Sequence, residues 1–546
     1  MKKRMAWVLA GVLPLAFLAL FFLWPVFSLV ARGFQDESGW TLDAVGHTLA
    51  SARTVRIIRQ TFTLAVLGTV FSTLLGLPGA YVLYRLRFRG QRALRAIVTI
   101  PFVLPSVVVG VAFRSLLNST GPLGWLGLDG TPTAVVAAMV FFNYSLVVRT
   151  VGALWSRLDE RTVQAARTLG ATPARAFVTI TLPALAPAIG SAASLVFLFC
   201  ASAFGIVLVL GGSRIGTVET EIWYQTTTML NLSAAAALSI VQLVFVSASL
   251  LLASVVRRRQ QRALASRATV SQQQLRSSDA PVVAVTLLVI GVLVLVPLGT
   301  LVYRSFVVRG GGLGLANYAN LATNASGALS VSVWAALCNS LIIGLCACAL
   351  ALILGWLVAY VLSRSPITRA GRTTITLLDS AFMLPLGISA VTVGFGFLIT
   401  LNRPPLDLRS SWVLIPIAQA LVALPLVVRT LLPTWRSIDP KLRQAAATLG
   451  ASDSRILATV DLPLTARSIG LAAGFAFATS LGEFGATSFL SRPDRPTLPV
   501  VVYRLISRPG AENFGTALAA AVVLAVVTAT VMSIAEALGG KETHGW

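Results

Sequence analysis

The chain has 546 residues, of which 56% are hydrophobic and only 11% are charged. Soluble globular domains carry about 25% charged residues, so this composition excludes an ordinary soluble protein and indicates a polytopic membrane protein. The formal net charge is +24. It does not indicate nucleic-acid binding, because the basic residues form short clusters between apolar runs, as the positive-inside rule predicts for membrane proteins.

Apolar runs recur along the whole chain, and about 20 apolar residues are enough to cross a bilayer. In the first half such runs lie near 7–31, 61–84, 97–117, 134–156, 184–211 and 233–256. In the second half they lie near 281–303, 337–363, 375–400, 411–433, 464–490 and 516–537. We therefore predict an all-α polytopic membrane protein with about twelve transmembrane helices.

Basic clusters alternate with loops that lack basic residues, and this alternation predicts the orientation. Five arginines lie within 85–95 and five within 149–175, whereas 118–133 has no lysine or arginine. The basic loops are expected in the cytoplasm. Three basic residues at positions 2–4 precede the first apolar run. That run is longer than a signal peptide's apolar region, so we expect a retained span with a cytoplasmic N-terminus.

The two halves of the chain repeat each other. Residues 146–183 match residues 426–463 at 18 of 38 positions, at a constant offset of 280. A stretch with six arginines, 257–280, joins the halves and is typical of a flexible linker. We predict two parallel halves, 1–256 and 281–546. A pseudo-two-fold axis along the membrane normal relates the halves, and the solute path lies between them.

The repeated stretch is polar and differs from the spans around it. In each copy an aspartate suits the N-terminus of a short helix, and small residues on that helix permit close approach by another body. A glycine can then end the helix in the left-handed conformation, and a Thr-Pro pair or a serine can cap a second helix. These residues are Asp159, Gln164, Ala165, Ala166, Gly170, Thr172 and Pro173, and Asp439, Gln444, Ala445, Ala446, Gly450 and Ser452.

The same stretch resembles the EAA motif of ABC importer permeases, E-A-A-x3-G-x9-I-x-L-P. The first copy matches at Gln164, Ala165, Ala166, Gly170, Ile180, Leu182 and Pro183. The second copy matches at Gln444, Ala445, Ala446, Gly450, Leu462 and Pro463, with Val460 in place of isoleucine. Glutamine stands for glutamate in both copies, which keeps the length and the hydrogen-bonding capacity but loses the charge.

The resemblance implies a type I ABC importer permease fold, in which the motif forms a coupling helix. Two copies of a cytosolic ABC ATPase are then expected on the two coupling helices, an extracytoplasmic solute-binding protein on the other side, and lipid of the bacterial inner membrane around the spans. The fused layout resembles the iron(III) and thiamine permeases. Segments 204–225 and 480–506 are most similar to the thiamine type, although part of the second also resembles molybdate and sulfate permeases.

No catalytic, cofactor or metal site is expected in this chain. It has no phosphate-binding G-x-x-x-x-G-K-[ST] loop, so the partner ATPase is expected to use ATP and magnesium. The two histidines are scattered, and the four cysteines lie in apolar runs without metal-like spacing. The alternative is a secondary transporter driven by an ion gradient, which is expected to carry several acidic residues within its spans.

Four polar residues at expected membrane depth are candidates for the solute pathway, because such residues are costly in a bilayer. Glu483 lies in the run 464–490 and aligns with Ala203 of the first half, and Asp379 lies at the start of the run 375–400. Asn143 and Tyr144 lie in the fourth run. For Glu483 the alternatives are a structural hydrogen bond between helices and a position at a span end nearer the surface. For Asn143 and Tyr144 the alternative is a polar contact between helices.

Overall fold

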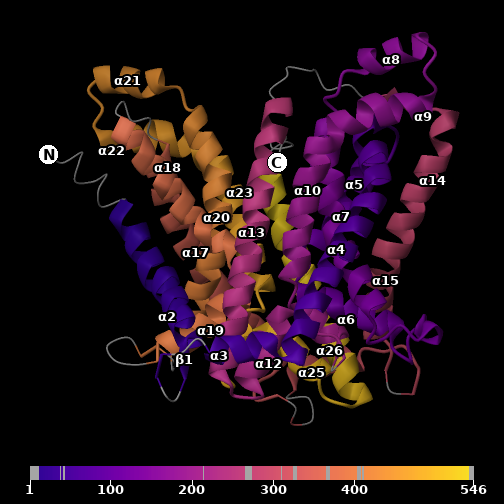
Figure 1. Ribbon diagram of the computed structural model, residues 1–546, viewed down its shortest axis with the longest axis vertical. Coiled ribbons are helices and arrows are strands. Elements are labelled where there is room, and N and C mark those ends of the chain that lie inside the picture. The colour runs from indigo at the N-terminus through magenta and orange to yellow at the C-terminus, as the bar shows by residue number, and fades with distance from the viewer. Residues whose placement is uncertain are drawn as a thin grey trace. The chain divides into compact units, whose positions relative to one another are not determined.

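The computed structural model describes residues 11–36, 39–40, 43–212, 214–264, 273–308, 310–323, 327, 329–363, 369–402, 407–408 and 411–539. These residues are mostly helical (Figure 1), which confirms the predicted all-α class. The strands described are two residues long: β1 (Gln35–Asp36) pairs antiparallel with β2 (Gly39–Trp40), and β3 (Leu86–Arg87) pairs parallel with β4 (Gln273–Gln274).

Ten helices in the described residues are long and apolar enough to cross a membrane, or eleven if one bent pair counts as a span. The ten are Gly11–Gly33, Ala52–Arg85, Pro132–Trp155, Pro173–Ala201, Leu232–Leu251, Ser277–Ser305, Val333–Leu362, Leu414–Ser437, Asp453–Gly482 and Ala511–Ala537. The predicted number was about twelve. The difference lies in the third run of each half.

That third run is broken in both halves at a Leu-Pro pair. In the first half α5 (Gln91–Val103) and α6 (Ser106–Leu117) meet at an angle of 103°. In the second half α18 (Arg369–Met383) leads through η8 (Leu384–Gly387) into the short α19 (Ala390–Thr400). Proline has no N–H and disfavours helical conformation in the residue before it, so Pro105 interrupts what composition alone predicts as one span.

The described residues form two compact units. One contains mainly Leu49–Glu221 and Val241–Asn317, and the other contains the helices before Leu49 together with Ile222–Ile240 and the chain after Tyr318. The first span of each half therefore belongs to the unit built mainly from the other half. The predicted sequential domains, 1–256 and 281–546, describe the repeat and stay a prediction.

The first-half unit is built around α4, α7 and α10, which pack against one another. Its elements are α4 (Ala52–Ala80), η2 (Tyr81–Arg85), α5, α6, η3 (Gly124–Leu126), α7 (Pro132–Trp155), α8 (Glu160–Thr168), α9 (Pro173–Ala176), η4 (Phe177–Thr181), α10 (Leu182–Ala201), α11 (Gly205–Leu210), η5 (Ser277–Asp279), α14 (Ala280–Val289), η6 (Ile290–Leu295) and α15 (Val296–Ser305).

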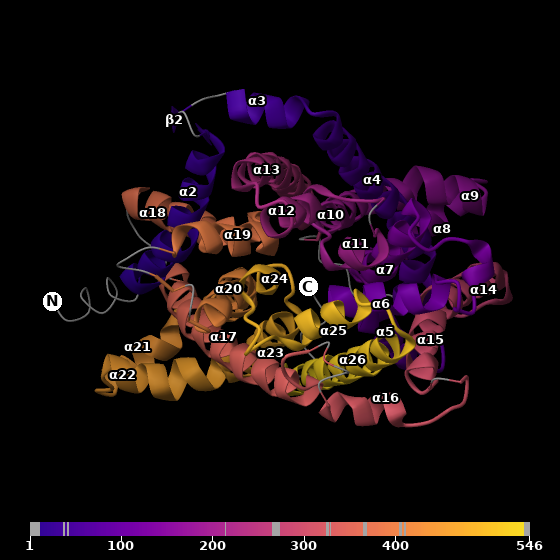
Figure 2. The same ribbon diagram turned by 90° about the horizontal axis from the view of Figure 1, so that it is seen from below.

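The second-half unit is built around α17, α20, α23 and α26, which lie side by side (Figure 2). Its elements are η1 (Ala19–Leu23), α2 (Trp24–Gly33), η7 (Asn320–Ala322), α17 (Val333–Leu362), α18, η8, α19, α20 (Leu414–Ser437), α21 (Pro440–Thr448), α22 (Asp453–Ile456), η9 (Leu457–Asp461), α23 (Leu462–Gly482), α24 (Thr487–Leu490), α25 (Leu498–Ile506) and α26 (Ala511–Gly539).

Four helices are divided between the two units: α3 (Asp43–Ala50), α12 (Val218–Thr227), α13 (Leu232–Leu264) and α16 (Ala316–Ala319). Helix α13 continues well beyond its apolar part, to Leu264. The predicted linker 257–280 is thus helical over its first residues, lies outside the described residues at 265–272, and then contains β4 and η5.

Both units pack a valine onto a glycine of the neighbouring helix. A Cβ atom at Gly76 of α4 would lie 2.6 Å from Val147 of α7, and one at Gly355 of α17 would lie 2.5 Å from Val427 of α20. Both valines are fully buried. Val147 and Val427 are equivalent in the sequence repeat, whereas the two glycines differ by one position. Both halves thus use a similar close approach of helices, which small residues permit in membranes.

Arginine 304 fastens the first span of the second half to the first-half unit. Its guanidinium lies at the C-terminal end of α6, where it donates to the Ser115 carbonyl, to Oδ1 of Asn118 at 2.9 Å and to Oγ1 of Thr120 at 2.8 Å. The last carbonyls of a helix have no partner within the helix, so a cation there stabilises the end of α6.

Replacing Arg304 by alanine is expected to destabilise the protein by about 2 kcal/mol, because a hydrogen bond to a charged group contributes about 1.5–3 kcal/mol. Thermal unfolding of the detergent-solubilised chain measures the loss as a lower Tm. Arg56→Ala is the matched control, because Arg56 is an exposed arginine of α4. An unchanged Tm for Arg304→Ala would contradict the assignment.

Candidate functional site

The first repeated loop begins at Asp159. The carboxylate of Asp159 accepts a hydrogen bond from the Arg161 N–H at 2.9 Å and caps α8, as its position before the helix predicts. None of the residues of α8 is buried. This helix lies beyond the ends of α7 and α10 (Figure 1), outside the apolar part of these helices.

Glycine 170 ends α8 in the left-handed conformation, with a φ of +88°. The Ala171 N–H donates to the Ala166 carbonyl at 3.0 Å, and the Gly170 N–H donates to the Arg167 carbonyl at 3.1 Å. This is the hydrogen-bond pattern of a Schellman motif. The chain resumes at Thr172, whose hydroxyl accepts from the Arg175 N–H at 3.2 Å and caps α9.

The second loop has the same local structure. Asp439 caps α21 by accepting from the Lys441 N–H at 2.9 Å, and Gly450 has a φ of +80°. The Ala451 N–H donates to the Ala446 carbonyl at 3.0 Å, and Ser452 caps α22. The local conformation predicted for both copies is therefore confirmed, including both left-handed glycines.

Each loop presents small and apolar residues to its surroundings. Gln164, Ala165, Gln444 and Ala445 are exposed, and the alanine after each pair is half-buried. Leu169 and Leu449 directly precede the two glycines, and each leucine is 88% exposed. A leucine this exposed at the same place in both copies is a small apolar contact point, which the sequence analysis did not single out.

The return from each loop into the next span differs from the prediction. The sequence analysis predicts a second helix after each glycine, separate from the span that follows it. Instead α9, η4 and α10 form one helix, Pro173–Ala201, and the second copy forms one helix from Asp453 to Gly482. A π-helical turn precedes each proline, with the Leu182 N–H bonded to the Phe177 carbonyl and the Leu462 N–H to the Leu457 carbonyl. A wider turn accommodates a proline without breaking the helix.

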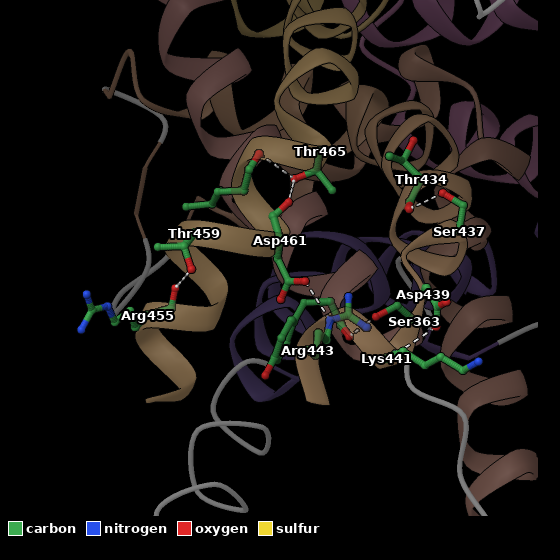
Figure 3. Close-up of polar contacts among 12 residues, drawn as sticks. Ser363, Thr434, Ser437, Asp439, Lys441, Arg443, Arg455, Thr459, Asp461 and Thr465 are labelled. Atoms are coloured by element: carbon green, nitrogen blue, oxygen red, sulfur yellow. Dashed lines mark hydrogen bonds and ion pairs between the residues drawn. The ribbon is translucent and has the colours of Figure 1, made fainter. Parts of the chain in front are cut away.

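Different ion pairs hold the two loops. Arg85, the last residue of η2, donates to the Leu158 carbonyl at 3.1 Å and lies 3.6 Å from the Glu160 carboxylate at the start of α8. In the second loop Arg443 of α21 pairs with Asp461, the last residue of η9, at 2.7 Å (Figure 3). The sequence analysis missed both pairs. The aligned residues Val163 and Thr181 show that the second pair has no counterpart.

Glu483 lies just after the end of α23, where the predicted run 464–490 breaks. It is 7% exposed, and its carboxylate accepts hydrogen bonds from the Ala486 N–H at 2.7 Å and the Thr487 N–H at 3.1 Å. The Thr487 hydroxyl also donates to the Glu483 carbonyl at 2.8 Å. Glu483 therefore caps the short helix α24, and its role in the solute pathway stays a prediction.

The other three pathway candidates lie elsewhere. Asp379 lies near the C-terminal end of α18, not at the start of a span, and is partly exposed. Asn143 and Tyr144 are buried in α7 of the first-half unit. The Asn143 amide donates to the Met139 carbonyl at 2.9 Å and to the Cys200 sulfur of α10 at 3.4 Å. Asn143 and Tyr144 thus belong to one compact unit, and Asp379 and Glu483 belong to the other.

Potential metal ligands do not form a cluster in the part of the chain that the structure describes. Within the described residues, no group of three or more His, Cys, Asp or Glu side chains could hold a metal ion. Cys200 and Cys348 are buried, whereas Cys338 and Cys346 are exposed on α17, and all four are free thiols. Polar features of the described residues are the two loops, the capped break after α23, and two buried acids of α12, Glu219 and Glu221.

A helical membrane fold with a duplicated, EAA-like loop at the ends of its spans is the arrangement that the resemblance to ABC importer permeases implies. Residues 68–262 match the family described as "Binding-protein-dependent transport system inner membrane component". This stretch therefore matches inner-membrane transport permeases, and the resemblance read from the sequence is confirmed.

Curated relatives match over nearly the whole chain. The chain is 26% identical to a thiamine transport system permease protein ThiP of Brucella abortus, over 88% of this chain and 87% of that protein. It is 26% identical to ThiP of Escherichia coli, over 89% of each chain. It is 25% identical to a putative ferric transport system permease protein FbpB 1 of Haemophilus influenzae, over 89% of this chain and 78% of that protein.

Among solved structures, a bacterial ABC transporter involved in alginate import is 20% identical with a TM-score of 0.40, covering 48% of this chain and 96% of that chain.

Proposed function

We propose that this permease forms the solute pathway of an importer driven by a separate ABC ATPase, with one ATPase copy on each of the two loops at α8 and α21. The observation that supports this most is the duplicated loop itself. Both copies have the same N-cap, the same left-handed glycine and the same 88% exposed leucine. A surface feature kept in both halves at this level of detail suits a partner that also has two equivalent halves.

Binding to the ATPase depends in this proposal on shape more than on charge. Glutamine occupies the position of the family's glutamate at Gln164 and Gln444, so an ionic contact at this position is lost. The exposed alanines and the leucines Leu169 and Leu449 then supply the contact area. ATP and magnesium act in the partner, and this chain binds no cofactor. A solute-binding protein delivers the solute on the side away from the loops, and the N-terminus lies in the cytoplasm.

The solute is thiamine or ferric iron in this proposal, because relatives that match nearly the whole chain are named for these solutes. Another solute, such as molybdate or sulfate, is the alternative within the same class. A secondary transporter is the alternative outside it. A secondary transporter would depend on acidic residues within its spans, and the energy source that drives uptake distinguishes it from the proposed importer.

The test is to coexpress the full chain with the ABC ATPase and the binding protein of its own organism and to reconstitute the purified complex. We expect the ATPase to copurify and ATP inside the vesicles to drive uptake of radiolabelled thiamine or ferric iron. Uptake driven by an imposed proton or sodium gradient without ATP would favour the secondary transporter. Failure of the ATPase to copurify with the intact chain would overturn the proposal.

A further inference from the structure

The second half carries two acidic residues that the first half lacks, and they lie at the two ends of one helix. Asp461 directly precedes α23, and Glu483 directly follows it. The aligned residues at the ends of α10 are Thr181 and Ala203. Helix α23 has 21 residues, so about 30 Å separates the two acids at 1.5 Å per residue.

An ion pair joins Asp461 to α21 in the second loop. The Asp461 side chain is 4% exposed, and its Oδ1 lies 2.7 Å from Nε of Arg443, which is 21% exposed. The Arg443 guanidinium also lies 5.9 Å from the ring centre of Trp435, a buried residue of α20. Arg443 thus joins α21 to the start of α23 and to the end of α20 (Figure 3).

A buried ion pair contributes little net stability, because desolvation of the two charges offsets most of their attraction. The first loop shows that this fold does not need the pair. Val163 and Thr181 occupy the aligned positions, and α8 still begins, ends and returns into its span as α21 does. The pair is therefore not required for the local fold of the loop, and it joins α21 to the start of α23.

The first loop is fastened to a different span. Arg85 binds the Leu158 carbonyl and lies close to Glu160 at the beginning of α8. Arg85 ends the helix that runs through α4 and η2, so this contact joins α8 to the span Ala52–Arg85. The ion pair of the first loop thus joins α8 to η2, and α8 also packs against η4. The ion pair of the second loop joins α21 to the start of α23.

At its far end α23 is connected to the capped break. The Glu483 carboxylate holds the first N–H groups of α24, so the end of α23 and the start of α24 move as one body. A continuous chain of contacts therefore runs from Arg443 through Asp461 and α23 to α24. In the first half the aligned positions are Thr181 and Ala203. The end of α10 is contacted differently, by Gln242, whose amide donates to the Ala201 carbonyl at 3.4 Å and to Glu219 at 2.6 Å.

Resting on the ATPase-driven function above, we propose that Arg443 and Asp461 are positioning residues that make α23 the connection between ATPase docking and the capped break at Glu483. The two coupling loops are then not equivalent: the loop at α21 moves the break after α23, and the loop at α8 moves the end of η2. The two halves have the same fold, but their loops move different elements.

A solute-independent labelling experiment tests the connection. The assembled complex is reconstituted with Cys338 and Cys346 replaced by serine and with Asp494→Cys, a 59% exposed site after α24. A membrane-impermeant maleimide measures labelling with and without a non-hydrolysable ATP analogue. We expect the analogue to change the labelling rate at least about fivefold, the lower range of typical coupling between sites. In R443V/D461T, which carries the first loop's residues, we expect this response to be lost while the ATPase stays bound.

The matched control is V163R/T181D, which places the same pair in the first loop and is expected to keep the response. The proposal is overturned if R443V/D461T keeps the full response, or if the parent complex binds the ATPase but shows no response. If R443V/D461T does not bind the ATPase, the comparison of Arg443→Lys with Arg443→Gln tests the proposal. Lysine keeps the positive charge and should keep the labelling response, whereas glutamine should lose it. Equal labelling responses in the two variants refute the proposal. A parent chain that binds no ATPase refutes the proposed function instead.

Discussion

The double substitution of Gly170 and Gly450 by valine is expected to abolish stable binding of the ATPase. Both glycines have a positive φ, +88° and +80°, and end the coupling helices through Schellman hydrogen bonds. An L-residue in this conformation costs about 1–2 kcal/mol, and a β-branched residue tolerates it least. About 1.4 kcal/mol is tenfold in affinity, so two distorted loops together are expected to weaken ATPase binding about a hundredfold, measured by copurification and titration.

The effect is expected to be confined to the loops, because a Cβ atom at either glycine would meet nothing within 4 Å. The double variant should therefore keep the Tm of the parent chain to within a few degrees. Asparagine at the same two positions is the permissive control, since it tolerates the left-handed conformation. Gly127→Val is the control for strain elsewhere, because Gly127 has a φ of +62° and open space around it in another loop. Undiminished ATPase binding by the double valine variant would contradict the docking site.

The local structure of the loops could be predicted because short-range chemistry decides it. An aspartate before a helix, a glycine after it and a serine or Thr-Pro before the next helix each satisfy backbone groups within a few residues. Asp159, Gly170 and Ser452 therefore adopt the predicted conformations. The repeat supports the same prediction for the second loop, because the second copy preserves the spacing of these residues at an offset of 280.

The unpredicted features depend on contacts between distant residues or on how an apolar run bends. Hydrophobicity does not distinguish one continuous span from two helices that meet at Pro105 or from a span followed by a short helix such as α24. Apolar composition also does not say which unit a span joins, and Arg304 shows that a polar contact at a helix end contributes to that choice. The Arg443–Asp461 pair is visible only when the two copies are compared for their differences.

Substitution of Glu483 by glutamine is expected to lower solute transport at least about tenfold while the complex stays assembled. Glutamine keeps one acceptor oxygen for the N–H groups of Ala486 and Thr487, which the carboxylate binds at 2.7 and 3.1 Å. It loses the negative charge, and a hydrogen bond to a charged group contributes about 1–2 kcal/mol more than a neutral one. ATP-dependent uptake of thiamine or ferric iron by the reconstituted complex measures transport, and copurification of the ATPase measures assembly.

Two further substitutions separate the charge of Glu483 from its capping role. Glu483→Leu leaves two buried N–H groups without an acceptor, at about 1–3 kcal/mol each, so it should lower the Tm as well as transport. Asp379→Asn removes a partly exposed acid of α18, and an effect as large as that of Glu483→Gln would move the pathway assignment towards α18. If Glu483→Gln transports as the parent does and only Glu483→Leu is impaired, Glu483 is a helix cap alone. In that case residues other than Glu483 must recognise the solute, because the negative charge at the break would have no part in transport.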